Sequence, residues 1–194
     1  MYLKPLGFFL GAYLLGAVPF GLLLAKAFGG PDPRTAGSGN IGANNVARLV
    51  GKSAGLITLL LDVGKGAAPT ALALFWLPAW QAAVVGICSF AGHIWPVFLG
   101  FKGGKGVATA MGVTLAFSPS ALAGVLAVFF LTAWRTGYVS VGSMAACGSA
   151  PFWLLVAGEP WPMTTAGLLM ALVVVWRHRE NIARLRAGQE HGLP

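Results

Sequence analysis

The chain alternates long apolar runs with short polar segments, a pattern that predicts membrane-spanning helices joined by loops at the water boundary. A helix needs about 20 apolar residues to cross a bilayer, and most of the runs reach that length. The runs are, approximately, Leu6–Phe28, Ser53–Leu77, Trp80–Leu99, Val107–Phe117, Pro119–Trp134, Tyr138–Ala157 and Trp161–Trp176. Only Val107–Phe117 is clearly short, and it decides the topology.

Two topologies fit the short run. A single helix from Val107 to Trp134 gives six spans and puts both chain termini on one side. A turn at Ser118-Pro119 gives seven, and serine as N-cap with proline in the first helical turn favours it. Seven spans collect loops 29–52, 99–106 and 135–137 and the tail on one side, leaving Lys4 as the only one of the 13 lysines and arginines clearly on the other. The positive-inside rule therefore predicts about seven transmembrane helices, with the amino terminus outside and the carboxyl terminus cytoplasmic.

Composition supports an all-α integral membrane protein. Hydrophobic residues make up 57% of the chain and charged residues 9%, and the mean hydropathy is +0.76, whereas a soluble domain carries about 25% charged residues. Its length predicts a single polytopic domain, residues 1–194. The net charge of +8 lies at the ends of apolar runs, which favours membrane topology and an anionic ligand over nucleic acid. Cys88 and Cys147 lie inside apolar runs and are interpreted as packing residues. The first run is long enough to span and has no small-residue cleavage site, so no signal peptide is expected.

Polar chemistry is confined to four segments, and the seven-span topology places all of them at the cytoplasmic face. They are Gly37–Arg48, Gly92-His93 with Phe101–Gly106, Arg135–Ser143, and Arg177–Leu185. Each combines cations with glycine, serine, asparagine or histidine. Backbone N–H groups beside cations are what a phosphate group requires. The segments therefore predict a phosphate-binding site at one membrane boundary.

Each segment also has a structural interpretation. The first is rich in glycine and asparagine, which tolerate left-handed backbone conformations and can turn N–H groups inward, with Arg48 as a fork for phosphate. It could equally be a tight interfacial loop that anchors Arg48 at lipid headgroups. Lys102–Gly106 precedes a helix N-terminus and so suits an anion, or its glycines serve close helix packing. A lone histidine in a span, such as His93, is often a hydrogen bond between helices.

The last two segments also have a functional and a structural interpretation. His178 and Asn181 are three residues apart, so they would face the same way on a helix, and imidazole can move or orient a proton near neutral pH. Ser140 and Ser143 open the sixth span and either cap it or donate to a ligand. Asp62 and Lys65, one turn apart inside a span, predict a structural ion pair. Glu190 is expected to pair with a basic residue of the tail or loop.

Several chemistries lack the residues that they need. Neither Gly104-Lys105-Gly106 nor Gly51-Lys52-Ser53 completes a nucleotide P-loop, because Leu99 and Val46 stand where its first glycine should be. Three histidines, two separated cysteines and five acids, without HExxH or CxxC spacing, give no metal site. Serine hydrolase chemistry lacks its GxSxG elbow.

Taken in order along almost the whole chain, these segments resemble one family, the bacterial membrane-bound glycerol-3-phosphate acyltransferases that use acyl phosphate. The matching stretches are Ser38-Gly39-Asn40 through Arg48, Gly92-His93 through Gly106, His178–Leu185 with Gly188 and Glu190, and the shorter Leu61–Gly66 and Tyr138-Val139-Ser140. The family's aromatic after Gly-His is kept as Trp95. The His-x4-Asp of soluble glycerol-phosphate acyltransferases is absent, since Phe98 and Ala183 occupy the aspartate positions.

The resemblance implies a multi-pass enzyme of the plasma or inner membrane with no metal or other cofactor. It would move a fatty acyl group from acyl phosphate to the 1-hydroxyl of sn-glycerol 3-phosphate, giving lysophosphatidic acid and phosphate, the first step of phospholipid synthesis. Its partners would be these two substrates and the lipid bilayer, with no nucleic acid. The rival hypothesis is a transporter of a phosphorylated anion, which cations and broken helices also suit; clustering of the polar groups at one face and the lack of an inverted repeat count against it.

The resemblance also assigns site residues. Ser38, Arg48, Lys105, Ser143, His178 and Asn181 would hold glycerol 3-phosphate and the reacting centre, while the Gly103-Gly104 turn and the first loop's glycines and asparagines would hold the phosphate of acyl phosphate. The expected site residues are, for catalysis, His178, Asn181, Ser38 and Lys105, and, for substrate binding, Arg48, Ser143, Asn40, Asn44, Asn45, Gly39, Gly42, Lys102, Gly103, Gly104, Gly106 and His93.

Overall fold

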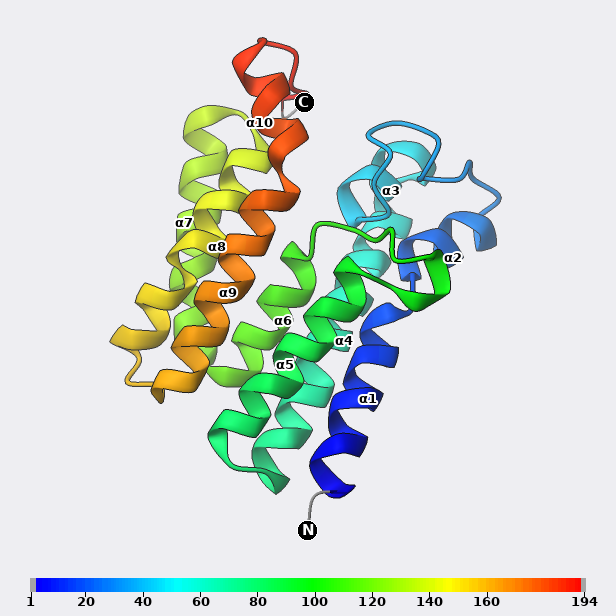
Figure 1. Ribbon diagram of the computed structural model, residues 1–194. Coiled ribbons are helices and arrows are strands. Elements are labelled where there is room, and N and C mark those ends of the chain that lie inside the picture. Colours follow the sequence, from blue (N-terminus) through cyan, green and yellow to red (C-terminus); the bar gives the residue numbers. More distant parts are fainter. Residues whose placement is uncertain (1–2, 193–194) are drawn as a thin grey trace. The chain divides into compact units, whose positions relative to one another are not determined.

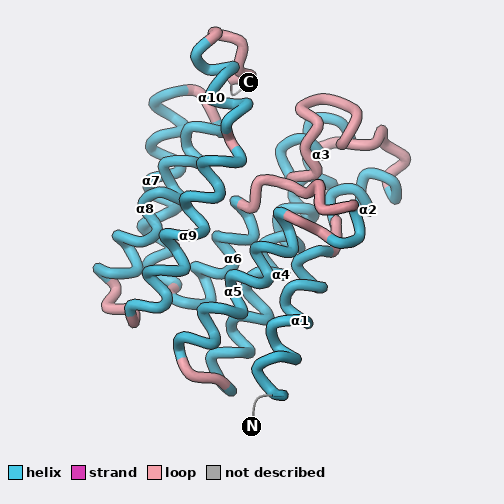
Figure 2. The backbone as a smooth tube through the Cα atoms, in the orientation of Figure 1, coloured by secondary structure: helices cyan, strands magenta, loops and turns pink. Residues whose placement is uncertain are grey.

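The computed structural model describes residues 3–192, and within that range every regular element is a helix (Figures 1 and 2). The elements are α1 (Leu3–Ala17), α2 (Phe20–Ala27), α3 (Ala43–Val50), α4 (Lys52–Trp76), α5 (Ala79–Ile94), the 3-10 turn η1 (Val97–Leu99), α6 (Val107–Phe117), α7 (Pro119–Thr136), α8 (Val139–Val156), α9 (Trp161–Arg177) and α10 (Arg179–Arg186). The predicted all-α class is confirmed.

The predicted chain break at Ser118-Pro119 is confirmed. Helix α6 ends at Phe117, and α7 begins at Pro119 with Ser118 as its N-cap. The Ser118 hydroxyl accepts a hydrogen bond from the amide of Ala121 at 3.3 Å, which satisfies one of the N–H groups that a helix start leaves unpaired. A single helix from Val107 to Trp134 is therefore wrong.

Three helix boundaries differ from the sequence prediction. The first apolar run is broken after Ala17, because Pro19 has no N–H to continue the helical ladder. Helix α3 lies within a stretch expected to be loop. His178 was expected to share a helix with Asn181, but it follows the end of α9 and precedes α10, so the two residues do not lie on one continuous helix.

Five helical stretches are long and apolar enough to cross a membrane, and α6 and α9 are shorter apolar helices; this count covers the described residues only. Large apolar side chains face outward, among them Phe75 at 85% and Trp134 at 77% exposure. A water-soluble surface would not tolerate so much exposed apolar area, whereas lipid does. The chain is therefore a multi-pass membrane protein. The side chain of Lys4, which entered the topology prediction, lies outside the described residues.

The chain divides into two compact units, one ending at Val113 and the other starting at Thr114. In unit 1, α5 packs on α1 and α4, and α3 packs on α4. Gly92 of α5 lies against the backbone of α1, where a Cβ would meet the carbonyl oxygen of Tyr13, so glycine sets this close approach. In unit 2, α8 packs between α7 and α9. A single domain over residues 1–194 stays a prediction.

In each unit the polar segments gather at one end. Within unit 1, α1 and α5 run toward, and α4 starts from, the end that carries loop 28–42, α3 and loop 95–106 (Figure 1). Within unit 2, the turn between α7 and α8 lies at the same end of that unit as the α10 tail, and Gly192 of the tail approaches the carbonyl oxygen of Gly137 in the turn. Each unit thus presents its sequence-predicted polar residues together.

Candidate active site

Asn45 organises the first polar loop of unit 1. Its side chain is buried, and its amide nitrogen donates to the carbonyl oxygens of Pro33, Ala36 and Asn40 at 2.9–3.1 Å. Its amide oxygen accepts from the backbone N–H of Ser38 at 2.9 Å. One amide therefore ties four points of the loop to α3, and the side chain is committed to holding the loop in shape.

Left-handed backbone geometry in this loop falls on glycine, as the sequence suggested, at Gly37 and Gly39. At Gly37 a Cβ would also meet the Asn45 amide oxygen. The asparagines act differently from the expectation, because none adopts a left-handed conformation. Asn40 instead accepts a hydrogen bond from the amide of Gly42 at 2.9 Å, just before α3 begins.

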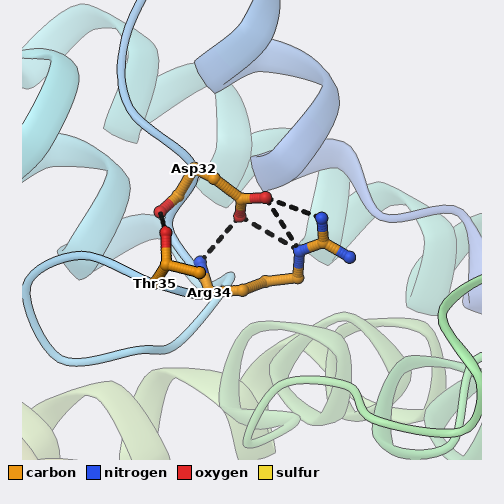
Figure 3. Close-up of polar contacts among 3 residues, drawn as sticks. All are labelled: Asp32, Arg34 and Thr35. Carbon is orange, nitrogen blue, oxygen red and sulfur yellow. Dashed lines mark hydrogen bonds and ion pairs between the residues drawn. The ribbon is translucent and has the colours of Figure 1, made fainter.

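The loop starts with a local ion pair that the sequence reading missed (Figure 3). Arg34 Nε and Nη2 donate to the carboxylate of Asp32, the shortest distance being 2.6 Å, and the Arg34 amide donates to Asp32 Oδ1 at 2.9 Å. The hydrogen bond from the Arg34 side chain holds the pKa of Asp32 below its usual value. Arg34 is thus engaged locally, whereas Ser38, Asn44 and Arg48 have exposed side chains.

Replacing Asn45 with alanine is expected to loosen this loop, because Pro33, Ala36 and Asn40 would lose their shared donor. Amide exchange over residues 33–42 should rise about tenfold or more, and acyl-acceptor binding should weaken. Asn44→Ala is the matched control, since the neighbouring Asn44 side chain is exposed. Equal exchange in both variants would contradict the role given to Asn45.

The glycine-rich loop 100–106 folds back onto the end of α5. The amides of Gly103 and Gly104 donate to the carbonyl oxygens of Ile94 and His93, both at 3.1 Å, and so cap the carboxyl end of that helix. Lys102 is exposed, Lys105 is half-buried, and Gly106 has a φ of 84°, directly before α6. The expectation of bare N–H groups at Gly103 and Gly104 does not hold, and direct phosphate contact by them stays a prediction.

His93 lies beneath this loop. Its side chain is 4% exposed, and the Gly104 backbone packs against its ring so closely that a Cβ on Gly104 would meet Nε2. The predicted ion pair on α4 is confirmed, with Lys65 Nζ 2.8 Å from Asp62 Oδ1. The Nδ1 atom of His93 lies 3.7 Å from the same oxygen.

Unit 2 holds the histidine expected to act in catalysis. His178 is 3% exposed, and its Nδ1 atom lies 2.8 Å from the carbonyl oxygen of Val174. A carbonyl oxygen only accepts hydrogen bonds, so Nδ1 is the donor in this contact. Ser143 is buried on α8, which begins at Val139. Tyr138 occupies the N-cap position and no side chain caps the helix, so the capping interpretation of Ser140 and Ser143 is wrong.

Asn181 is held by the tail. Its amide nitrogen donates to Glu190 Oε1, and Arg184 Nε donates to Glu190 Oε2 at 2.7 Å, which confirms the expected pairing of Glu190 with a basic residue of the tail. Burial raises the pKa of Glu190, but the hydrogen bonds from Asn181 and Arg184 outweigh it and bring the pKa below the usual value. The tail thereby fixes the orientation of a predicted catalytic amide.

Glu190→Gln is expected to release this clamp and to lower the free energy of unfolding by about 1–3 kcal/mol near neutral pH. Because the folded-state pKa of Glu190 is lowered, its stabilisation is present above about pH 4.3 and is lost as the pH falls through the lower folded value. The unfolding temperature of the wild type should therefore fall more on acidification than that of Glu190→Gln. Parallel pH profiles would contradict this assignment, and Gln189→Glu is a control on the adjacent exposed residue.

Each unit brings together part of the predicted set. Unit 1 carries Ser38, Arg48, Lys105 and the glycine loop, and unit 2 carries Ser143, His178 and Asn181. Within residues 3–192 no three His, Cys, Asp or Glu side chains are grouped as a metal site requires. The predicted residues are cations, amides, hydroxyls and one imidazole, groups that can bind phosphate and orient a hydroxyl.

The fold defines a multi-pass membrane protein, and the predicted residues are of the types that bind phosphorylated ligands. The sequence model of the family described as glycerol-3-phosphate acyltransferase matches residues 6–188. The chain belongs to that family. The resemblance noted from the four polar segments is therefore confirmed, and a transporter is not favoured.

Similar sequences and solved structures support the same family membership. A glycerol-3-phosphate acyltransferase of Geotalea daltonii is 47% identical over 94% of both chains, and one of Aquifex aeolicus is 44% identical over 97% of this chain and 99% of its own. The crystal structure of PlsY, an integral membrane glycerol 3-phosphate acyltransferase, in its glycerol 3-phosphate form matches 98% of this chain and 96% of its own with a TM-score of 0.94 and 41% identity. Its lysophosphatidic acid form matches with a TM-score of 0.91.

Proposed function

We propose that this protein transfers a fatty acyl group from acyl phosphate to the 1-hydroxyl of sn-glycerol 3-phosphate, releasing lysophosphatidic acid and inorganic phosphate. Family membership over residues 6–188 is the observation that carries this proposal. The match to a structure of PlsY in its glycerol 3-phosphate form supports the acceptor, and the match to its lysophosphatidic acid form supports the product. The reaction is the first step of phospholipid synthesis.

The proposed topology has seven spans. It adds the shorter helices α6 and α9 to the five long apolar stretches, with the amino terminus outside and the carboxyl terminus in the cytoplasm. The cation distribution supports this orientation, because α6 begins directly after the loop that carries Lys102 and Lys105, and α9 ends at Arg177. The enzyme would lie in the plasma or inner membrane, with its reaction at the cytoplasmic face.

The predicted cations and hydroxyls would bind the phosphate groups of the two substrates. Arg48 and Lys105 would form charge-assisted hydrogen bonds with phosphate oxygens, and Ser38 and Ser143 would add hydroxyl contacts. The Gly103-Gly104 turn and Lys102, near the amino-terminal end of α6, would face the phosphate of acyl phosphate, since a helix N-terminus and a cation favour an anion. The apolar surface of the helices would hold the acyl chain.

Departure of phosphate needs little help from a general acid, because phosphate is a good leaving group from a mixed anhydride. The 1-hydroxyl oxygen attacks the acyl carbonyl carbon, the bond from that carbon to the bridging phosphate oxygen breaks, and the bond electrons leave with phosphate. His178 and Asn181 would orient the hydroxyl, and its proton would pass to a phosphate oxygen. Holding the reactants together supplies several kcal/mol of the required acceleration, and cations on the departing phosphate add electrostatic stabilisation.

Purified protein in detergent tests this proposal directly. With acyl phosphate and glycerol 3-phosphate together, phosphate and lysophosphatidic acid should appear in equal amounts, and an acyl thioester should not replace acyl phosphate. A transporter would need a sealed membrane and would form no lysophosphatidic acid. Absence of product from folded, glycerol-3-phosphate-binding protein would contradict the proposed function.

A further inference from the structure

Unit 1 contains a buried charged cluster that the proposed chemistry does not use. Asp62 and Lys65, one turn apart on α4, are 2% and 3% exposed. Burying an ionisable group inside a membrane protein costs desolvation free energy unless the group is paired, so such groups usually have a structural or functional role. These two are paired at 2.8 Å, and each also reaches a different helix of the unit.

Lys65 reaches the end of α1. Its Nζ atom donates to the carbonyl oxygen of Val18 at 3.0 Å, at the break between α1 and α2. The Val18 carbonyl oxygen, which also accepts the Phe20 amide at 3.1 Å, lies at the negative end of α1, where a cation is favourable. The same lysine is locked through its backbone, because the Ser89 hydroxyl donates to the Lys65 carbonyl oxygen at 2.6 Å.

Asp62 reaches α5. Its Oδ1 atom lies 3.7 Å from Nδ1 of His93, and the other side of the His93 ring supports Gly104. The backbone carbonyl of His93 also accepts the Gly104 amide at 3.1 Å. Asp62, His93 and Gly104 thus form a continuous series of contacts from the centre of α4 to the loop that carries Lys102 and Lys105.

We propose that Asp62, Lys65 and His93 form a positioning network that fixes the 100–106 loop and makes no contact with substrate. The inference rests on the proposed function, in which this loop receives the phosphate of acyl phosphate. It changes the role expected of His93 from a substrate ligand to a support. It also explains why residue 104 is a glycine, since any side chain there would displace the His93 ring.

The test combines amide exchange with kinetics on the detergent-solubilised protein, using His93→Leu and Asp62→Asn. Both variants should speed exchange over residues 100–106 about tenfold. Both should raise KM for acyl phosphate about tenfold or more, with a smaller rise in KM for glycerol 3-phosphate and a smaller fall in kcat, because Lys105 lies in this loop while Arg48 and His178 lie outside it. Thr70→Val is the matched control, because it removes a buried hydrogen bond of the same helix, from the Thr70 hydroxyl to the Gly66 carbonyl at 2.7 Å, away from the network.

Exchange at the wild-type rate in His93→Leu would overturn the proposal, as would an equal rise of both KM values with a lowered unfolding temperature. If Asp62→Asn does not fold, Asp62→Leu combined with Lys65→Met removes both charges, and its 100–106 loop should exchange as in His93→Leu; a protected loop would again overturn it. Exchange requires no turnover, so failure of the acyltransferase assay with a loop that still responds to His93→Leu would count against the proposed function alone.

Discussion

Replacing His178 with alanine is expected to lower kcat about 100-fold or more, with a smaller change in either KM, because the residue is assigned to the reacting hydroxyl. The ring is buried and fixed by the Val174 carbonyl, so the variant loses an oriented nitrogen that bulk water cannot replace. Initial rates of phosphate release under saturating substrates measure the effect.

His191→Ala is the matched control, since that histidine lies exposed in the tail and should be replaceable at no cost to turnover. Asn181→Ala should follow His178→Ala in direction, because its amide is clamped by Glu190 beside the same helix junction. Normal kcat in His178→Ala would show that the histidine only packs.

Replacing Arg48 with alanine should raise KM for glycerol 3-phosphate about 10- to 100-fold, the loss expected for a charge-assisted phosphate contact. Arg48 is exposed near the end of α3, directly after the loop held by Asn45. Arg48→Lys should recover only part of the loss, because lysine keeps the charge but not the planar fork.

Arg34→Ala, in the loop that precedes α3, serves as the control for Arg48, since Arg34 already pairs with Asp32. Its KM for glycerol 3-phosphate should stay within about threefold of wild type, as expected of an exposed ion pair. Equal kinetic losses in the two variants would mean that the loop needs positive charge in general, not the Arg48 fork.

Much of the fold could be predicted from the lengths of the apolar runs and from residues that start or end helices. The boundary between α6 and α7 was predictable because Ser118 and Pro119 are strong local signals. Helix α3 was missed because its surroundings are rich in glycine and asparagine, and the burial of Val46 that stabilises it depends on packing against the rest of the unit. The break at Pro19 was missed because membrane helices often tolerate proline.

The sequence predicted which residues could form the site, but it predicted less well what each of them contacts and does. The Asp62–Lys65 pair followed from i, i+3 spacing, but its extension to His93 and Gly104 depends on how α4 and α5 pack. The Asn45 bonds reach 5 to 12 residues back along the chain, and no local pattern encodes them. The engaged amides of Gly103 and Gly104 could not be foreseen either, because composition reports glycine but not the direction of its N–H.

The central claim is that the four polar segments work at the same face of the membrane. Single cysteines at exposed Thr35 and Gln189, in a chain with Cys88 and Cys147 replaced by alanine, test it by labelling with a membrane-impermeant thiol reagent; Ala157→Cys marks the opposite face. In intact cells Ala157→Cys should react while the other two are protected, and in inverted vesicles the pattern should reverse. Labelling of Thr35→Cys and Gln189→Cys from opposite sides would contradict the account.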